Sequence, residues 1–141
     1  MRKRRDIAKT KILIVEDEII TAMSLKQLFE HWGLGKCKQA SSGREAFEKM
    51  ISEKPDIVLI DIHLKGEING IETARQLQAN SRVPIIFITG YSDEETIKKA
   101  DKIKPVAYFV KPLDFYKLRS TIESVVSKKK RNLKQKKSSN L

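Results

Sequence analysis

The sequence predicts an α/β fold in which five parallel strands form one sheet with helices on both faces. Four short runs of apolar, mostly β-branched residues recur along the chain, at residues 12–15, 57–60, 85–88 and 108–110. These runs are continuous rather than alternating, which is typical of strands buried on both faces of a parallel sheet. The segments between them have helical spacing, so a strand–helix unit is repeated along the chain.

A weaker strand is expected at residues 36–40, which brings the number of strand–helix units to five. The expected helices cover residues 18–32, 42–53, 70–79, 93–102 and 114 to about 130. The apolar pattern of the first helix includes Ile19 and Met23, and the pattern of the second places Ile51 inward. Both helices are therefore expected to pack an apolar face on the sheet.

The length of 141 residues suggests one domain, with a core large enough to need no disulfide or metal for stability. The single cysteine, Cys37, excludes an internal disulfide and a multi-cysteine zinc site. No apolar run approaches the length of a membrane span, and the basic start MRKRRD is not followed by an apolar signal core. A cytoplasmic protein is therefore expected.

The net charge of +11 is concentrated at the two ends of the chain. Residues 1–11 carry six basic groups and one acid, and residues 125–141 carry seven basic groups and no acid. The remaining residues, 12–124, hold 16 basic and 17 acidic groups, so the body has a charge of −1. Such tails are either solvated or attract nucleic acid or anionic lipid.

Polar residues follow the predicted strands at the points where these strands end. Glu16 and Asp17 follow the first strand, Asp61 the third, Thr89 the fourth and Lys111 the fifth. In open α/β sheets, ligands bind at the carboxyl ends of the strands. Three clustered carboxylates repel one another unless a cation lies among them, and Mg²⁺ prefers such oxygen ligands. A metal, a lysine and a hydroxyl group together can hold a phosphoryl group.

Four segments in this order resemble the receiver domain of two-component response regulators: KILIVEDE, DIVLIDIHLKGEINGIETA, PIIFITGYS and YFVKPLD. The resemblance is to single-domain, chemotaxis-regulator-like receivers. It implies a doubly wound, flavodoxin-like fold with strand order 2-1-3-4-5. The receiver domain is expected at residues 11–126, between a basic tail at 1–10 and a basic tail or helix extension at 127–141.

The resemblance assigns Asp61 as the phosphoacceptor, a carboxylate that forms an aspartyl phosphate. It also implies a bound Mg²⁺, for which Mn²⁺ can substitute. Its ligands would be Asp17, Asp61 and the backbone carbonyl of His63, with Glu16 contributing directly or through a water. The side chain of His63 is interpreted as an exposed loop residue rather than a ligand.

Three further residues acquire roles from the resemblance. Lys111 should pair with the phosphoryl oxygen and, before phosphorylation, with Asp61, and a cis bond to Pro112 would aim it inward. Thr89 should hydrogen-bond the phosphoryl group. Tyr108 matches the aromatic switch residue of the family, although an aromatic residue in a strand can equally be part of the core.

The implied function is a signalling switch with self-catalysed phosphotransfer and autodephosphorylation, not a metabolic enzyme. A sensor histidine kinase or phosphotransfer protein would donate the phosphoryl group. The changed surface, at about residues 93–126, would then bind a downstream protein or form a homodimer. The fifteen residues after Val126 cannot form a helix-turn-helix, so no sequence-specific DNA binding is expected.

Other interpretations stay open at this stage. The chain is expected to be a stand-alone receiver, and the alternative is a receiver fragment of a larger regulator or hybrid kinase. A nucleic-acid or membrane-surface binder with basic tails could use the same fold, and steep salt dependence would support it. A Mg²⁺-dependent phosphatase with Asp61 as nucleophile would need a general acid, for which only His63 is near in sequence.

Overall fold

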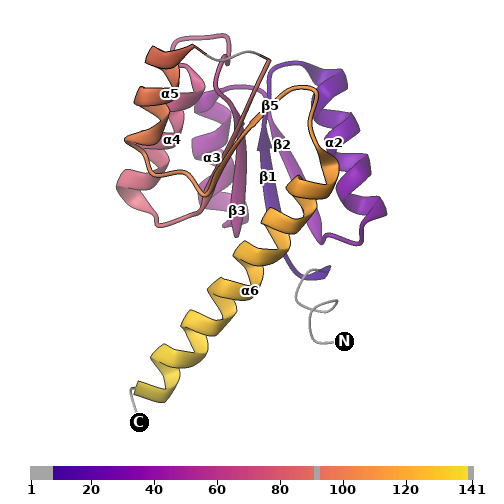
Figure 1. Cartoon of the computed structure of the whole chain (residues 1–141), viewed down its shortest axis with the longest axis vertical. Helices are drawn as coiled ribbons and strands as arrows, with labels where there is room; N and C mark the ends of the chain where they lie inside the picture. The colour runs from indigo at the N-terminus through magenta and orange to yellow at the C-terminus, as the bar shows by residue number, and fades with distance from the viewer. Residues whose placement is uncertain (1–7, 91–92, 140–141) are drawn as a thin grey trace.

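Five parallel strands form the centre of the molecule in the computed structural model, which describes residues 8–90 and 93–139 (Figure 1). The strands pair in the order β2-β1-β3-β4-β5, as predicted. Their bounds are Lys11–Val15 for β1, Lys36–Ala40 for β2, Ile57–Asp61 for β3, Ile85–Thr89 for β4 and Ala107–Val110 for β5. Because all four pairings are parallel, the carboxyl ends of the strands meet at one edge of the sheet.

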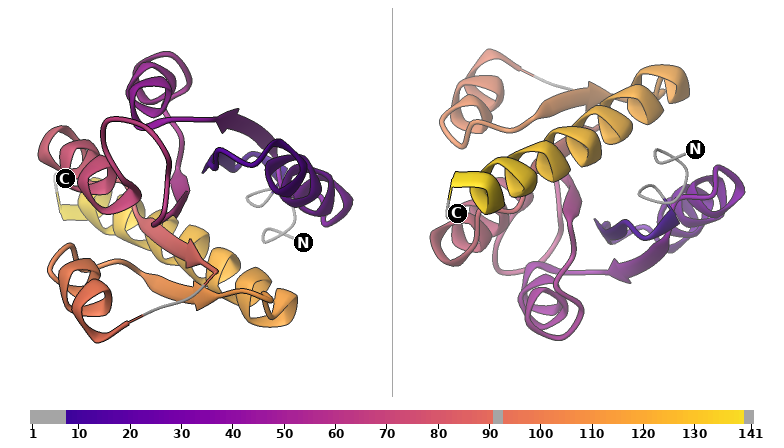
Figure 2. Two further views of the ribbon diagram at one scale, coloured as in Figure 1. Left: turned by 90° about the horizontal axis from the view of Figure 1, so that it is seen from above. Right: turned by 90° about the horizontal axis from the view of Figure 1, so that it is seen from below.

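Among the residues that the structure describes, five helices cover the two faces of this sheet (Figure 2). They are α2 Ile19–His31, α3 Gly43–Glu53, α4 Gly70–Asn80, α5 Glu94–Asp101 and α6 Phe115–Ser139. One buried cluster joins α2 and α6 to the sheet, and a second joins α3, α4 and α5 to the other face. In the described part of the chain, every helix is too short or too polar to cross a lipid bilayer.

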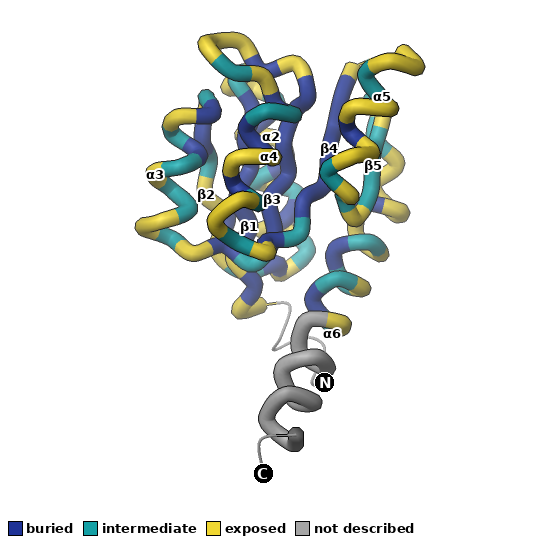
Figure 3. The backbone as a smooth tube through the Cα atoms, turned by 90° about the vertical axis from the view of Figure 1, so that its left-hand side faces the viewer, coloured by how far each residue is buried: buried dark blue, intermediate teal, exposed yellow. Residues whose placement is uncertain are grey.

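Side chains along each strand alternate between these two clusters. In β1, Ile12 and Ile14 face α2 and α6, whereas Leu13 and Val15 face the other three helices. The residues of β3 and β4 are all buried, and the strands form the dark centre of Figure 3. Continuous apolar runs are therefore needed because both faces of these strands are covered.

The faces of two helices differ from the prediction. In α2 the buried residues are Ala22, Leu25 and Phe29, while Ile19 and Met23 are exposed. The inward placement of Ile51 in α3 was also wrong, because its side chain is 79% exposed. Met23 and Ile51 each lie one position past a packed residue, Ala22 and Met50, and so are about 100° around the helix axis and reach solvent. Ile19 is the first residue of α2.

The last helix, α6, continues to Ser139. The apolar pattern predicted a helix to about residue 130, with residues 127–141 as either a tail or an extension of this helix. The structure shows the extension as far as residue 139. Leu118, Ile122 and Val126 anchor the first half of α6 on the sheet, and the second half extends past the body of the molecule (Figure 1). The domain boundaries at residues 10 and 126 stay predictions.

Candidate functional site

The polar residues predicted from the strand ends do meet at one edge of the sheet. Glu16 directly follows β1, Asp61 is the last residue of β3, Thr89 is the last of β4 and Lys111 directly follows β5. The backbone N–H of Glu16 continues the sheet by donating to the carbonyl of Ala40 at 2.9 Å. The sheet itself therefore fixes where these side chains start.

Three carboxylates form the centre of this edge. One oxygen each from Glu16, Asp17 and Asp61 lie within 4.8 Å of one another. The side chain of Glu16 is fully buried and that of Asp61 is 8% exposed, while Asp17 is half-buried. Because burial removes the water that would screen their charges, three ionised carboxylates at this distance repel strongly.

The protonation of Glu16 reflects this crowding. Burial, the first cause, and the neighbouring Asp61, the second, raise the pKa of the Glu16 carboxyl to about 8, with Lys111 acting in the opposite direction. Within the described chain, neither oxygen of Glu16 accepts a hydrogen bond. Buried carboxylate oxygens without donors, beside two further carboxylates, are a suitable ligand set for a divalent cation such as Mg²⁺.

Lys111 supplies the positive charge opposite the acids. Its Nζ lies 3.5 Å from Oε1 of Glu16 and 3.9 Å from Oδ2 of Asp61. The sequence predicted a pairing with Asp61, whereas the nearer carboxylate is that of Glu16. The backbone N–H of Lys111 donates to the carbonyl of Thr89 at 2.7 Å. The bond between Lys111 and Pro112 is cis, as predicted.

The loop after β3 holds the carboxylate of Asp61 through its backbone. The N–H of His63 donates to Oδ1 of Asp61 at 2.9 Å, a contact that the sequence did not indicate. His63 itself is exposed, in agreement with its interpretation as a loop residue. Oδ1 of Asp61 is thus occupied by a donor, while Oδ2 faces Lys111.

Gly70, at the start of α4, closes this loop against Asp61. Its N–H donates to the carbonyl of Ile62 at 2.9 Å, and an added Cβ would lie only 2.0 Å from the carbonyl oxygen of Asp61. Only glycine permits the helix to approach the strand end this closely.

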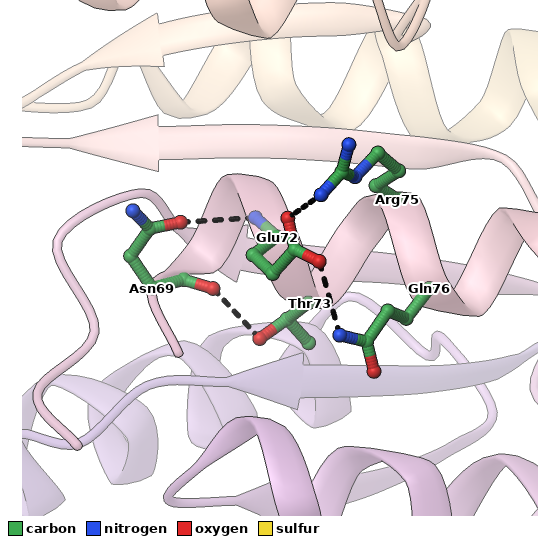
Figure 4. A network of polar contacts seen from close by, with 5 residues as sticks. All are labelled: Asn69, Glu72, Thr73, Arg75 and Gln76. Atoms are coloured by element: carbon green, nitrogen blue, oxygen red, sulfur yellow. Dashed lines mark hydrogen bonds and ion pairs between the residues drawn. The ribbon is translucent and has the colours of Figure 1, made fainter. Parts of the chain in front are cut away.

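Hydrogen bonds in the first turn of α4 hold its start in place (Figure 4). Oδ1 of Asn69 accepts a hydrogen bond from the backbone N–H of Glu72 at 2.9 Å. The backbone carbonyl of Asn69 accepts a hydrogen bond from the Thr73 hydroxyl at 2.8 Å. The carboxylate of Glu72 in turn accepts from Arg75 and Gln76. These contacts give hydrogen-bond partners to groups in the first turn of the helix, where backbone N–H groups have no partner within the helix. They also anchor the loop that carries the N–H of His63.

Thr89 and Tyr108 lie on neighbouring strands beside the acids. Thr89 is fully buried at the end of β4. Tyr108 lies in β5, packs against the cluster of α3, α4 and α5, and has a buried hydroxyl oxygen. Thr89 pairs with Val110, and Tyr108 pairs with Phe87, two residues before Thr89. The roles of Thr89 and Tyr108 stay predictions.

Comparison with known proteins identifies relatives with the same sequence pattern. The profile of the response regulator receiver domain matches residues 12–123. The transcriptional regulatory protein ZraR of Escherichia coli (strain K12) is 36% identical over 117 residues, which are 82% of this chain and 26% of ZraR. PdtaR of Mycobacterium tuberculosis (strain H37Rv) is 30% identical over 118 residues, 84% of this chain and 57% of PdtaR. The chain thus spans about a quarter to just over half of these relatives.

Solved structures agree with this match. The signal receiver domain of a modulated diguanylate cyclase from Desulfovibrio desulfuricans G20 superposes with a TM-score of 0.79 at 38% identity, over 86% of this chain and 97% of that one. The N-terminal domain of a response regulator/sensory box/GGDEF three-domain protein from Carboxydothermus hydrogenoformans superposes with a TM-score of 0.78 at 27% identity. The match covers 88% of this chain and 99% of that one. With the profile match and the acidic edge, these likenesses show that this chain belongs to the response regulator receiver domain family.

Proposed function

We propose that this chain is a phosphorylation-controlled signalling switch in which Asp61 accepts a phosphoryl group from a sensor histidine kinase or phosphotransfer protein. The observation that supports this most is the meeting of three carboxylates with Lys111 at one sheet edge of a receiver-family fold. A fully buried glutamate beside two other acids is costly to keep unless it serves a charged ligand. Phosphoryl transfer needs this combination of anionic metal ligands and a cation.

The residues divide the chemistry as follows. A carboxylate oxygen of Asp61 attacks phosphorus, the bond from phosphorus to the donor histidine nitrogen breaks, and the imidazole leaves with the electron pair and takes up a proton. Asp17, Asp61, the His63 carbonyl and Glu16, directly or through water, would hold Mg²⁺ or Mn²⁺. When bound, this ion would neutralise negative charge that develops on the phosphoryl oxygens. Later hydrolysis of the acyl phosphate by water would return Asp61 to its carboxylate.

Lys111 and Thr89 contribute from the other side of the site. The Nζ of Lys111, which lies between Glu16 and Asp61, is placed to pair with a phosphoryl oxygen on Asp61. The Thr89 hydroxyl would donate a hydrogen bond to the same group, since Thr89 ends the strand paired with β3. Both groups attract the new dianion, so phosphorylation would shift β4 and β5 relative to the acids.

The signal would leave the site through β5. Tyr108 would change its packing when Thr89 moves, which alters the surface formed by α5, β5 and the first half of α6. Its exposed apolar residues Val106 and Val110 would contact a downstream protein or a second copy of the chain. We place this switch in the cytoplasm, either alone or as one domain of a larger regulator or hybrid kinase.

Incubation with Mg²⁺ and acetyl phosphate, followed by intact-mass measurement, tests this proposal. The wild-type chain should gain one phosphoryl group only when Mg²⁺ is present, and Asp61→Asn should gain none. Asp101→Asn, which removes an exposed acid at the end of α5, is the matched control and should be labelled like the wild type. Absence of label, under conditions that label a known receiver, would refute the switch.

A further inference from the structure

The edge of the sheet opposite the acidic site is basic. Four loops lead into β2, β3, β4 and β5 at this edge, and β1 begins there as well. These loops and the first residues of β1 and β2 carry six exposed cations, namely Lys11, Lys36, Lys54, Arg82, Lys102 and Lys104. The cations come from every strand of the sheet, so they surround the edge rather than forming one local cluster. We call this set the basic edge.

The cations of the basic edge outnumber the acids beside it. The last turns of α2, α3 and α5, which lead into this edge, carry Glu30, Glu53 and Asp101. Residues 54–56, 81–84 and 102–106 contain one further acid, Asp56. Its carboxylate accepts a hydrogen bond from the backbone N–H of Lys11 at 2.9 Å, and is thereby engaged in holding β1. The basic edge therefore presents an excess of positive charge at the end of the molecule farthest from Asp61 along the strands.

The helix α6 adds more positive charge at the same end. It begins at Phe115, four residues after Lys111, runs antiparallel to the strands and passes beyond the basic edge (Figure 1). Residues 125–141 carry seven basic groups and no acid. At about 1.5 Å per residue, the helical part from 127 to 139 extends by roughly 20 Å. The fold thus joins one charged segment of the sequence to a charged surface of the domain.

We propose that the basic edge and the second half of α6 together bind the phosphate backbone of a nucleic acid duplex without reading its sequence. A duplex carries about one negative charge per 1.7 Å, and its affinity for cations comes from the release of condensed counterions. Residues 128–137 contain seven basic residues within ten positions of the sequence. Such a density of positive charge matches the close spacing of phosphates along a duplex.

Two features of the sequence favour a duplex over other polyanions. Residues 127–139 contain a single apolar residue, Leu133, so this part of α6 has no apolar face to insert into a lipid surface. Residues 125–141 contain no aromatic residue on which the bases of a single strand could stack. Contacts to the phosphate backbone, which DNA and RNA duplexes share, need neither an apolar helix face nor aromatic side chains.

Fluorescence anisotropy with a labelled duplex of about 20 base pairs of arbitrary sequence, as DNA and as RNA, tests the proposal on the full chain. The tail variant combines Lys129→Gln, Lys130→Gln and Arg131→Gln. The edge variant combines Lys36→Gln, Lys54→Gln and Lys104→Gln. The matched control combines Lys65→Gln, Lys98→Gln and Lys117→Gln, three exposed cations outside the basic edge. Circular dichroism verifies that all of them fold.

The wild type should bind a duplex with an affinity that falls steeply with salt. Loss of three phosphate contacts should reduce the slope of log K against log[salt] by about 2.7 in the tail and edge variants. At about 0.1 M salt this weakens binding roughly 500-fold, and the control should lose much less. Asp61→Asn should bind like the wild type, which separates this inference from the phosphorylation chemistry. Equal binding by all three triple variants, or tighter tail-dependent binding to phosphatidylserine vesicles than to either duplex, would overturn the proposal.

Discussion

Substitution of Glu16 by glutamine should stabilise the protein at neutral pH in the presence of a metal chelator. The Glu16 side chain is fully buried, and burial together with Asp61 raises the pKa of its carboxyl from 4.5 to about 8. Between these two values the unfolded chain releases the proton that the folded chain keeps. The favourable contribution of the protonated Glu16 to the free energy of unfolding is therefore largest below pH 4.5, and it decreases as the pH rises toward 8.

The size of the effect follows from the same two values. At pH 7 the solution is about 2.5 pH units above the unfolded pKa, and each unit corresponds to about 1.36 kcal/mol. The wild type should therefore lose about 3 kcal/mol of stability between pH 4.5 and pH 7 through this residue. Glutamine has the shape of the protonated acid and does not titrate, so Glu16→Gln should be more stable than the wild type at pH 7 by up to that amount.

Urea unfolding followed by circular dichroism at pH 5, 6 and 7 measures this difference. The gap between Glu16→Gln and the wild type should widen as the pH rises. Glu48→Gln, at an exposed position of α3, is the matched control and should follow the wild type. The reasoning is refuted if Glu16→Gln is less stable than the wild type at pH 7, or if the gap does not depend on pH.

Three other substitutions or treatments test separate contacts. Lys111→Ala removes the cation that lies 3.9 Å from Asp61. A hydrogen bond to a charged group contributes about 1.5–3 kcal/mol. Acetyl phosphate should therefore label this variant about 10- to 100-fold more slowly than the wild type. Gly70→Ala places a Cβ 2.0 Å from the Asp61 carbonyl and should lower the free energy of urea unfolding by about 1–3 kcal/mol, whereas Gly90→Ala, with nothing within 4 Å, should not. Burial raises the pKa of the Cys37 thiol to about 11, so iodoacetamide should not modify the folded protein at pH 8 but should do so in urea; rapid labelling of the folded state would contradict this.

The strands β1, β3 and β4 could be predicted from the sequence because their pattern has a single physical explanation, whereas β5 carries a similar apolar run but is only half-buried, with Val110 exposed. A continuous β-branched run such as residues 57–60 is stable only where both faces are covered. Helix faces were less certain, since α2 carries apolar residues on more than one side and only Ala22, Leu25 and Phe29 fit the space left by the sheet. The end of α6 could not be predicted because its basic second half has no apolar stripe, which is compatible with either a frayed tail or an extended helix.

The location of the site could be predicted as well, since parallel strands end at one edge. The contacts within it could not. The preference of Lys111 for Glu16 depends on side-chain conformations, and the N–H of His63 reaches Asp61 only through the shape of the following loop. The close approach of Gly70 to Asp61 depends on the packing of α4, of which the sequence shows only a glycine at a helix start.

The central claim is that Asp61 itself carries the phosphoryl group. Borohydride reduction of the protein after treatment with acetyl phosphate and Mg²⁺ converts an aspartyl phosphate to homoserine, and peptide mass spectrometry then locates the modified residue. The account predicts homoserine at position 61 and none when Mg²⁺ is withheld. Homoserine at position 17, or at any acid outside the carboxylate cluster, with Asp61 unchanged, would contradict it.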